Sequence, residues 1–593
     1  MNGYRKSSQP LLPKQHTPPP RGSYDIYPTH PLPAGQITHG FDVLADRLAW
    51  QQGIVIDGMV GVLWDHLRAH LDEALHRRGI AARWVSVDEA LRPSEQIDHL
   101  VAPYLGGDDP IFGMRFEGTL SDFFDPQRLP LTTALDAPII TYGTGAALIN
   151  DDAYLVYVDV PKNEIQYRAR AGSIHNVGAT GPDDPGVMYK RFYFVDWVVL
   201  GDHAATILPR VDLYVDGQDA DTPALIGGPD LWEVLTRISR TWCRVRPWFE
   251  PGPWGGQWMK ERIPGLAQDV PNYAWSFEMI APEQGIILES GGSLLEVSFD
   301  LLMRHNRAAI LGSHAERFGR EFPIRFDFLD TFGGGNLSLQ CHPRPSYIRQ
   351  HFGERFTQDE TYYILDCKPG ARVYLGFQDD IDAGQFRAAL EDSIDNGTPV
   401  DVEHFVQTQP AEKHRLFLIP GGTIHCSGAD NMVLEISATP YIFTFKMYDW
   451  LRLDLQGKPR PLNIPRAFNN LYFERRGSVV KRELVSQPVL IEAGSDWQML
   501  HLPTHRAHFY DVHRIEFETA VTIRTDDSPH LLLLVEGESL LLETREGQRQ
   551  RFNYAETFMV PAAAQSYSLI NEGGAPIKVV KAFLKAGWTE PEE

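Results

Sequence analysis

The sequence is poor in cysteine and in basic residues. Only four of its 593 residues are cysteines, and none of them forms a Cys-x-x-Cys pair. This scarcity excludes a disulfide scaffold and a thiolate zinc finger, and it is typical of proteins of the reducing cytoplasm. The 55 lysines and arginines are outnumbered by 78 acidic residues, which gives a net charge of -23. We therefore expect neither nucleic acid nor anionic lipid as the main partner, because phosphate backbones and headgroups require a basic surface.

Long apolar runs are also missing, and we expect no secretory leader. No stretch approaches the roughly 20 apolar residues that a membrane span needs. The sequence starts MNGYRKSSQP, which contains no apolar core of a signal peptide. Hydrophobic residues make up 43% of the chain and charged residues 22%, which is ordinary for a folded soluble protein. At roughly 150 residues per domain, this length predicts about three to four domains, and no membrane partner is expected.

Changes in composition divide the chain into four expected segments. Residues 1–39 are rich in proline and are predicted to form a disordered tail. Residues 40–245 alternate apolar strands with helical stretches, which predicts an α/β domain with a parallel sheet. Residues 246–481 and 482–593 contain short strands separated by Gly, Asp and Pro turns. This pattern predicts two all-β barrels or sandwiches.

One group of polar side chains has the spacing of a metal site. Gln340 and His342 alternate with apolar residues on a predicted strand, so they point to one face. Glu360 begins another strand, and a Pro-Gly-Gly turn leads into His425. Two imidazoles, a carboxylate and an amide oxygen are a suitable ligand set for Zn²⁺ or another divalent cation. Each residue alone is more often a core histidine or a solvated carboxylate, so the spacing by itself leaves both interpretations open.

These motifs resemble class I phosphomannose isomerase, a zinc-dependent family with the cupin (jelly-roll barrel) fold. The resemblance covers roughly residues 250–470 in order and spacing. It rests on the strings Leu337–Pro343, Glu360–Asp366, Pro369–Phe377, Ile419–His425, Leu434–Ile436, Tyr448–Arg452 and Gly457–Arg460. It implies an aldose–ketose isomerase that interconverts mannose 6-phosphate and fructose 6-phosphate through an enediol. It also implies that one Zn²⁺ is bound by Gln340, His342, Glu360 and His425.

The same resemblance implies catalytic roles for Glu435, Lys446 and Arg452. Glu435 matches an acidic position of the family, and either this carboxylate or a water at the metal would move the proton between C1 and C2. Lys446 stands where the family pattern has arginine, and it would bind phosphate or neutralise charge, with Arg452 as a weaker candidate. Asp327 stands where the pattern has lysine. These two departures keep open a different sugar substrate, or a metal- and sugar-binding regulatory protein without turnover.

The two flanking segments resemble domains that have lost their sites. The C-terminal segment resembles the second, non-catalytic cupin domain of the same isomerases, with Ser566 at the position of the ligand histidine. Residues 54–61 resemble the phosphate-binding loop of P-loop nucleoside-type kinases, but Leu63–Asp65 replaces the Gly-Lys-Ser/Thr that holds phosphate. We therefore expect a degenerate kinase-like domain without phosphotransfer. Asp57 and the Lys190-Arg191 pair stay open as a surviving anion site or as ordinary surface charge.

Overall fold

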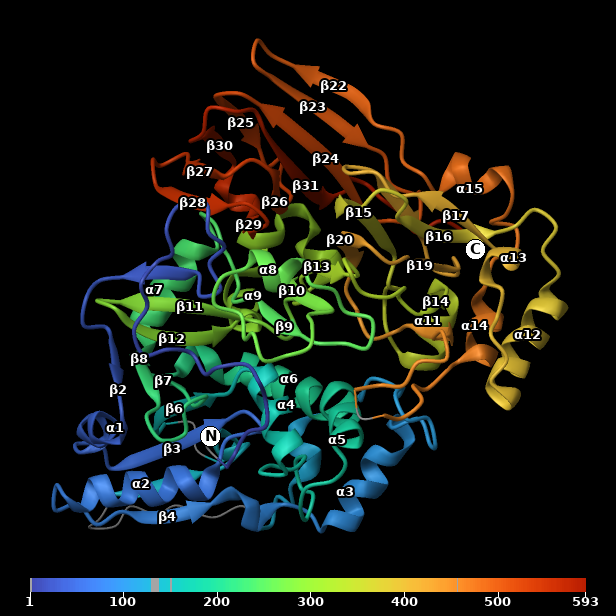
Figure 1. Cartoon of the computed structure of the whole chain (residues 1–593). Helices are drawn as coiled ribbons and strands as arrows, with labels where there is room; N and C mark the ends of the chain where they lie inside the picture. Colours follow the sequence, from blue (N-terminus) through green and yellow to red (C-terminus); the bar gives the residue numbers. More distant parts are fainter. Residues whose placement is uncertain (1–2, 129–137, 150–151, 456) are drawn as a thin grey trace. The chain divides into compact units, whose positions relative to one another are not determined.

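The structure is a computed structural model, and it describes residues 3–128, 138–149, 152–455 and 457–593. The chain divides into two compact units, and many of their elements are labelled in Figure 1. Unit 1 comprises Met1–Thr17, Tyr27–Ile238 and Pro282–Asn306, and unit 2 comprises Pro18–Ile26, Ser239–Ala281 and Arg307–Glu593. The chain therefore passes between the units more than once, a path that a division into consecutive segments does not predict.

A seven-stranded sheet forms the centre of unit 1. Its strands, in order across the sheet, are β2 (Ile37–His39), β8 (Ala224–Gly227), β7 (Leu213–Asp216), β6 (Tyr154–Asp159), β3 (Gly53–Gly58), β5 (Ile139–Tyr142) and β4 (Arg83–Ser86). The five strands from β7 to β4 are parallel, whereas β8 and β2 add antiparallel pairings at one edge. Short apolar runs such as Ile54-Val55-Ile56 are typical of parallel strands buried on both faces. The parallel sheet predicted from the alternating pattern is present.

Helices connect these strands. They are α1 (Phe41–Leu48), α2 (Trp64–His76), α3 (Ser94–Val101), α4 (Lys162–Ala171), α5 (Pro185–Arg191), α6 (Trp197–Ile207) and α7 (Gly228–Ile238). On α2, the helical spacing of Leu67, Leu71 and Leu75 places all three on one buried face. A second sheet of unit 1 contains β1 (Thr29–Leu32), β11 (Gly285–Ser290) and β12 (Ser293–Ser298).

The segment expected to be a disordered tail takes part in both sheets of unit 1. Strand β1 pairs with β11, and β2 pairs with β8. Arg5 forms an ion pair of 2.9 Å with Glu164 on α4. A proline such as Pro31 is tolerated in β1 because an edge strand does not need every N–H for pairing. Residues 29–39 therefore contribute strands to both sheets, although the proline content of the segment predicted a tail that need not fold.

Unit 2 begins with two sheets that we call the N-terminal sheet pair. The first sheet has the order β18 (Leu416–Ile419), β15 (Glu360–Cys367), β20 (Asn431–Ala438), β13 (Ile324–Asp330), β10 (Trp275–Met279) and β9 (Trp248–Glu250). The second has the order β17 (Val406–Pro410), β16 (Arg372–Phe377), β19 (His425–Ser427), β14 (Leu339–Cys341) and β21 (Phe445–Tyr448). All described pairings are antiparallel. The accompanying helices are α8 (Trp258–Arg262), α11 (Pro345–Phe352), α12 (Ala383–Asn396), α13 (Val402–Phe405), α14 (Ile464–Asn470) and α15 (Ser478–Glu483).

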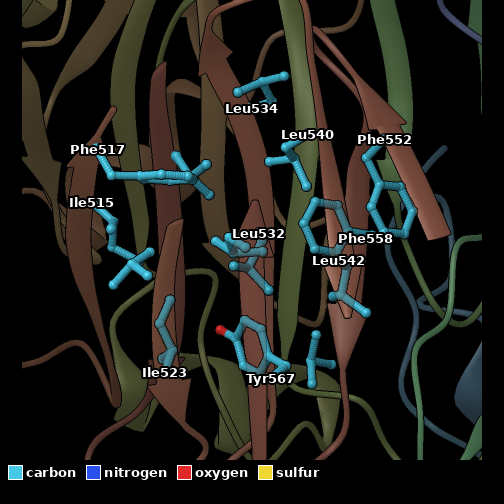
Figure 2. Packing of buried hydrophobic residues seen from close by; sticks show 14 of the residues in the cluster. Ile515, Phe517, Ile523, Leu532, Leu534, Leu540, Leu542, Phe552, Phe558 and Tyr567 are labelled. Carbon is cyan, nitrogen blue, oxygen red and sulfur yellow. The ribbon is translucent and has the colours of Figure 1, made fainter. Parts of the chain in front are cut away.

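Two further antiparallel sheets form the C-terminal sheet pair of unit 2. One has the order β22 (Val489–Ala493), β23 (Trp497–Leu502), β24 (Tyr510–Phe517), β31 (Ile577–Leu584), β26 (His530–Glu536) and β29 (Thr557–Val560). The other has the order β25 (Ala520–Arg524), β30 (Ser566–Asn571), β27 (Ser539–Thr544) and β28 (Arg549–Asn553). Side chains such as Leu532, Leu542 and Phe558 fill the space between the sheets (Figure 2). This interior is packed with apolar groups rather than polar ligands.

Among the described residues, none of the helices combines the length and the apolar character that crossing a membrane requires.

Candidate metal centre

Three buried side chains meet between the two sheets of the N-terminal sheet pair. His342 directly follows β14, Glu360 begins β15 and His425 begins β19. One ligand atom from each side chain lies within 4.8 Å of the ligand atoms of the other two. All three residues are buried. We call these residues the His/Glu/His cluster.

Strand pairing places the fourth predicted ligand beside this cluster. Gln340 on β14 is paired with His425 on β19 and with Lys446 on β21. Paired residues project from the same face of a sheet, so these three side chains form one row across three strands. Gln340 Nε2 lies 3.4 Å from His425 Nε2. The structure therefore brings Gln340, His342, Glu360 and His425 together.

Backbone carbonyl groups orient both imidazoles of the cluster. His342 Nδ1 lies 3.0 Å from the carbonyl oxygen of Phe443, and His425 Nδ1 lies 2.9 Å from that of Thr423. A carbonyl oxygen only accepts hydrogen bonds, so each Nδ1 carries the proton and each Nε2 keeps its lone pair. Both Nε2 atoms face Glu360, which is the orientation that metal-binding histidines need.

The carboxylate of Glu360 has the properties of a cation ligand. Burial by itself raises its pKa, but His342 and His425 outweigh this effect and hold the pKa well below its usual range. Glu360 Oε2 contacts His342 Nε2 and lies 3.5 Å from His425 Nε2. No hydrogen bond reaches Glu360 Oε1 in the described part of the chain, although this atom is buried. Because buried acceptors are normally satisfied, the donor set of two imidazoles, a carboxylate and an amide fits a divalent cation.

Arg475 fixes the turn that leads into His425. Its Nη1 donates hydrogen bonds to the carbonyl oxygens of Pro420 (2.9 Å) and Gly421 (2.7 Å), and it also reaches the hydroxyl of Thr423. The Thr423 carbonyl in turn accepts from His425 Nδ1. Arg475 was not predicted from the sequence, because it lies about 50 residues from the turn and no local pattern links the two. Arg475 therefore supports His425 through the turn.

Buried charges lie next to the cluster on β13 and β20. Asp327 is paired with Glu435, and Arg325 stands two residues before Asp327 on the same face. Arg325 forms ion pairs with Glu435 and, at 3.2 Å, with Asp327. Burial raises the pKa of Glu435 well above its usual range, Asp327 and Glu360 add to the rise, and Arg325 opposes it. Sequence reasoning missed Arg325, although an arginine inside the apolar strand Ile324–Leu329 was a usable signal.

The two predicted cationic residues have different surroundings. Burial lowers the pKa of Lys446 to about 8, and the neighbouring Arg460 adds to this effect. Arg452 donates from Nη2 to Asp449 at 2.6 Å and from Nη1 to a backbone carbonyl oxygen. The guanidinium of Arg452 is therefore engaged by Asp449 and by the backbone carbonyl oxygen of Asn336, whereas Lys446 belongs to the row that contains Gln340.

The candidate anion-binding residues of unit 1 are engaged internally. Asp57 is fully buried and lies 2.7 Å from His203 Nε2. Lys190 and Arg191 are buried and donate to backbone carbonyl oxygens. Trp64, at the start of α2, donates its indole N–H to a threonine hydroxyl. Asp57, Lys190 and Arg191 are therefore not surface charges, and their contacts do not form an open anion site.

Comparison with known proteins gives two separate similarities. Residues 40–240 match a family described as a domain of unknown function, DUF8485. The chain is also similar to mannose-6-phosphate isomerase ManA of Bacillus subtilis (strain 168), with 24% identity over 222 residues that cover 37% of this chain and 65% of ManA. Mannose-6-phosphate isomerase of Streptococcus mutans serotype c (strain ATCC 700610 / UA159) is 26% identical over 226 residues, which cover 37% of this chain and 64% of the relative. The matched region thus spans about two thirds of the length of these relatives.

Two solved structures also align with part of this chain. The crystal structure of mannose 6-phosphate isomerase from Bacillus subtilis has a TM-score of 0.46 and 18% identity, and covers 58% of this chain and 99% of that chain. A mutant phosphomannose isomerase from Salmonella typhimurium has a TM-score of 0.45 and 15% identity, and likewise covers 58% of this chain.

Proposed function

We propose that the protein is a metal-dependent aldose–ketose isomerase of a sugar phosphate, and that its substrates are mannose 6-phosphate and fructose 6-phosphate. The observation that carries this proposal is the convergence of His342, Glu360 and His425, with Gln340 beside them. The relatives named mannose-6-phosphate isomerase support it. The acidic net charge and the few cysteines support a cytoplasmic enzyme that binds a small molecule rather than nucleic acid.

The proposed cofactor is one Zn²⁺ held by Gln340, His342, Glu360 and His425. The ion would supply Lewis-acid stabilisation of negative charge on the carbonyl and hydroxyl oxygens of the sugar. His342 and His425 would bind it through Nε2, because their Nδ1 atoms are committed to backbone carbonyl groups. The burial of all three cluster residues would exclude water from the reacting atoms.

The reaction moves one proton from C2 to C1 and a second proton from the C2 hydroxyl oxygen to the C1 oxygen, so that the carbonyl group at C1 of the aldose becomes that at C2 of the ketose. We assign the proton transfer to the Glu435 carboxylate, which would take the proton from C2 of the enediol-forming sugar and return it to C1. The Lys446 ammonium group, in one row with Gln340, would hold the substrate phosphate. Arg452 is the weaker candidate for this contact because Asp449 already engages it.

The remaining parts are proposed to have no catalytic site. The N-terminal sheet pair would be the catalytic cupin domain, and the C-terminal sheet pair, with its apolar interior, would be a non-catalytic cupin. The parallel sheet of unit 1 supports a kinase-like domain. Phosphotransfer is not expected from it, because Trp64 and Asp65 stand where a phosphate-binding loop has Lys and Ser or Thr.

A coupled assay with zinc-loaded full-length protein tests the proposal. Wild type should convert mannose 6-phosphate to fructose 6-phosphate, and His342→Ala should lose both the bound zinc and the activity. His404→Ala is the matched control, because His404 is an exposed histidine of the same unit. Zinc-loaded wild type without exchange on any hexose 6-phosphate would refute the isomerase. Sugar-phosphate binding without exchange would instead indicate the regulatory alternative.

A further inference from the structure

A buried arginine joins the two carboxylates that lie beside the His/Glu/His cluster. Arg325, Asp327 and Glu435 are each 4% exposed. Arg325 contacts Glu435 through Nη2 and Asp327 through Nε. One guanidinium thus bridges a carboxylate on its own strand, β13, and a carboxylate on the neighbouring strand, β20. The contact with Asp327 is an ion pair of 3.2 Å, whereas the contact with Glu435 is a hydrogen bond donated by Nη2.

This arginine also accounts for a missing positive charge. The sequence pattern that the chain resembles has lysine at the position of Asp327. Arg325 lies two residues earlier on β13, so both side chains leave the same face of the sheet about 7 Å apart. The inner face of β13 therefore carries a cation at position 325, and Asp327 is one of its partners.

We propose that Arg325 is a positioning residue for the isomerisation, which aims one oxygen of Glu435 at the sugar. This inference rests on the proposed function. Arg325 and the Ser437 hydroxyl both donate to Glu435 Oε1, with the serine at 3.0 Å. The second oxygen, Oε2, receives neither of these two donors, and the Glu360 side chain lies beside the same carboxyl group. We assign the proton transfer from C2 to Oε2. In this arrangement Arg325 would act on the reaction through its contact with Glu435.

The geometry separates this role from that of an ordinary structural ion pair. A buried structural ion pair needs only one partner for each charge. In Glu435, both donors, Arg325 Nη2 and Ser437 Oγ, bind the same oxygen, Oε1. Two donors on one oxygen fix the rotation of the carboxylate. Proton transfer depends strongly on such alignment, because small errors in position lower the rate by large factors.

The test compares Arg325→Met and Arg325→Lys with wild type, all in the zinc-loaded full-length protein. We expect Arg325→Met to lower kcat about 100-fold, with KM within about threefold and one zinc per chain retained. Arg325→Lys should have a kcat about tenfold higher than that of Arg325→Met, since lysine restores the positive charge but not the two-directional donors of the guanidinium. Exchange of the C2 proton with deuterated solvent, measured by NMR, should fall in parallel with kcat.

Further variants keep the inference falsifiable if Arg325→Met folds poorly. Ser437→Ala removes the other donor to Oε1 at little change in volume, and it should lower kcat about three- to tenfold. Without Arg325, the Asp327 carboxylate would lose its partner. The double variant Arg325→Leu/Asp327→Lys removes this carboxylate and places a positive charge at position 327, so it should be more active than Arg325→Met. Arg524→Met, whose side chain is 83% exposed, serves as the control.

The outcomes distinguish this inference from the proposed function. Wild type without C2 exchange would overturn both. Active wild type together with an Arg325→Met variant that keeps kcat within twofold per zinc-loaded chain would overturn the inference alone. An Arg325→Met variant that partly unfolds or loses zinc, but whose zinc-loaded chains keep the wild-type kcat, would show that Arg325 has only a structural role. That result would also contradict the inference.

Discussion

Two backbone carbonyl oxygens decide which nitrogen each histidine of the site presents. The carbonyl groups of Phe443 and Thr423 accept from Nδ1 of His342 and His425, so both Nε2 atoms are left for Glu360 and for a cation. The ligand set thus depends on single atoms, and removing the charge of one ligand should weaken cation binding strongly.

Glu360→Gln tests that statement. The amide keeps the shape of the side chain but removes the only negative charge of the cluster. We expect zinc affinity to fall at least about 100-fold, because a neutral amide is a much weaker ligand than a carboxylate. Competition with a chelator of known affinity measures the change. Glu403→Gln, at an exposed glutamate of unit 2, is the control. Equal zinc affinity in Glu360→Gln and wild type would remove Glu360 from the site.

At the scale of elements, the turn between β18 and β19 decides whether His425 is in place. Arg475 holds this turn through two carbonyl groups and a hydroxyl group. Arg475→Ala should therefore weaken zinc binding about 10- to 100-fold, as expected for a residue that supports a ligand indirectly. Isothermal titration with zinc measures this. Arg482→Ala, at a side chain that is 63% exposed, should bind zinc like wild type. Unchanged affinity in Arg475→Ala would mean that the turn is rigid without its arginine.

Strand pairing also sets a pH dependence in the C-terminal sheet pair. Burial lowers the pKa of His513 to about 3, and Lys581 and His501 on the paired strands add to this effect. In the unfolded state His513 binds a proton as the pH falls below about 6.5, whereas in the folded state it does so only near pH 3. The free energy of unfolding therefore falls as the pH drops from about 6.5 toward 3. Relative to His513→Gln, wild type should lose on the order of 2 kcal/mol between pH 7 and pH 4. Urea unfolding at several pH values measures the difference, and parallel pH profiles would contradict it.

The elements show what the sequence could predict. Apolar runs and helical periodicity predicted β3, β6 and α2, because local patterns dictate these elements. The spacing around His342 and His425 made a metal site one of two open interpretations, and the resemblance to the isomerase family implied the four ligands. Arg325 and Arg475 escaped prediction because their partners are distant in sequence, and only strand register and turn geometry bring them together. The order of residues 29–39 escaped for the same reason.

At the scale of the whole molecule, stability and chemistry are assigned to different parts of unit 2. Phe558 and Phe552 stack at 3.8 Å inside the C-terminal sheet pair, where Phe558 is 1% exposed. Phe558→Ala should lower the free energy of unfolding by about 3–5 kcal/mol, as large cavities in packed cores do. Isomerase activity per folded chain should stay unchanged, because this core contributes no ligand. Thr522→Ala, exposed on β25, is the stability control. A loss of specific activity at full folding would show that the C-terminal sheet pair takes part in catalysis.

The central claim is that Gln340, His342, Glu360 and His425 hold one cation. X-ray absorption at the zinc edge of the loaded full-length protein tests it most directly, together with the zinc content per chain. Cys341 and Cys426 adjoin the ligands in sequence but lie on the opposite faces of β14 and β19. The account predicts one zinc per chain, bound by nitrogen and oxygen at about 2.0–2.2 Å, with two imidazole signatures and no sulfur. A sulfur shell near 2.3 Å, or zinc without imidazole scattering, would contradict it.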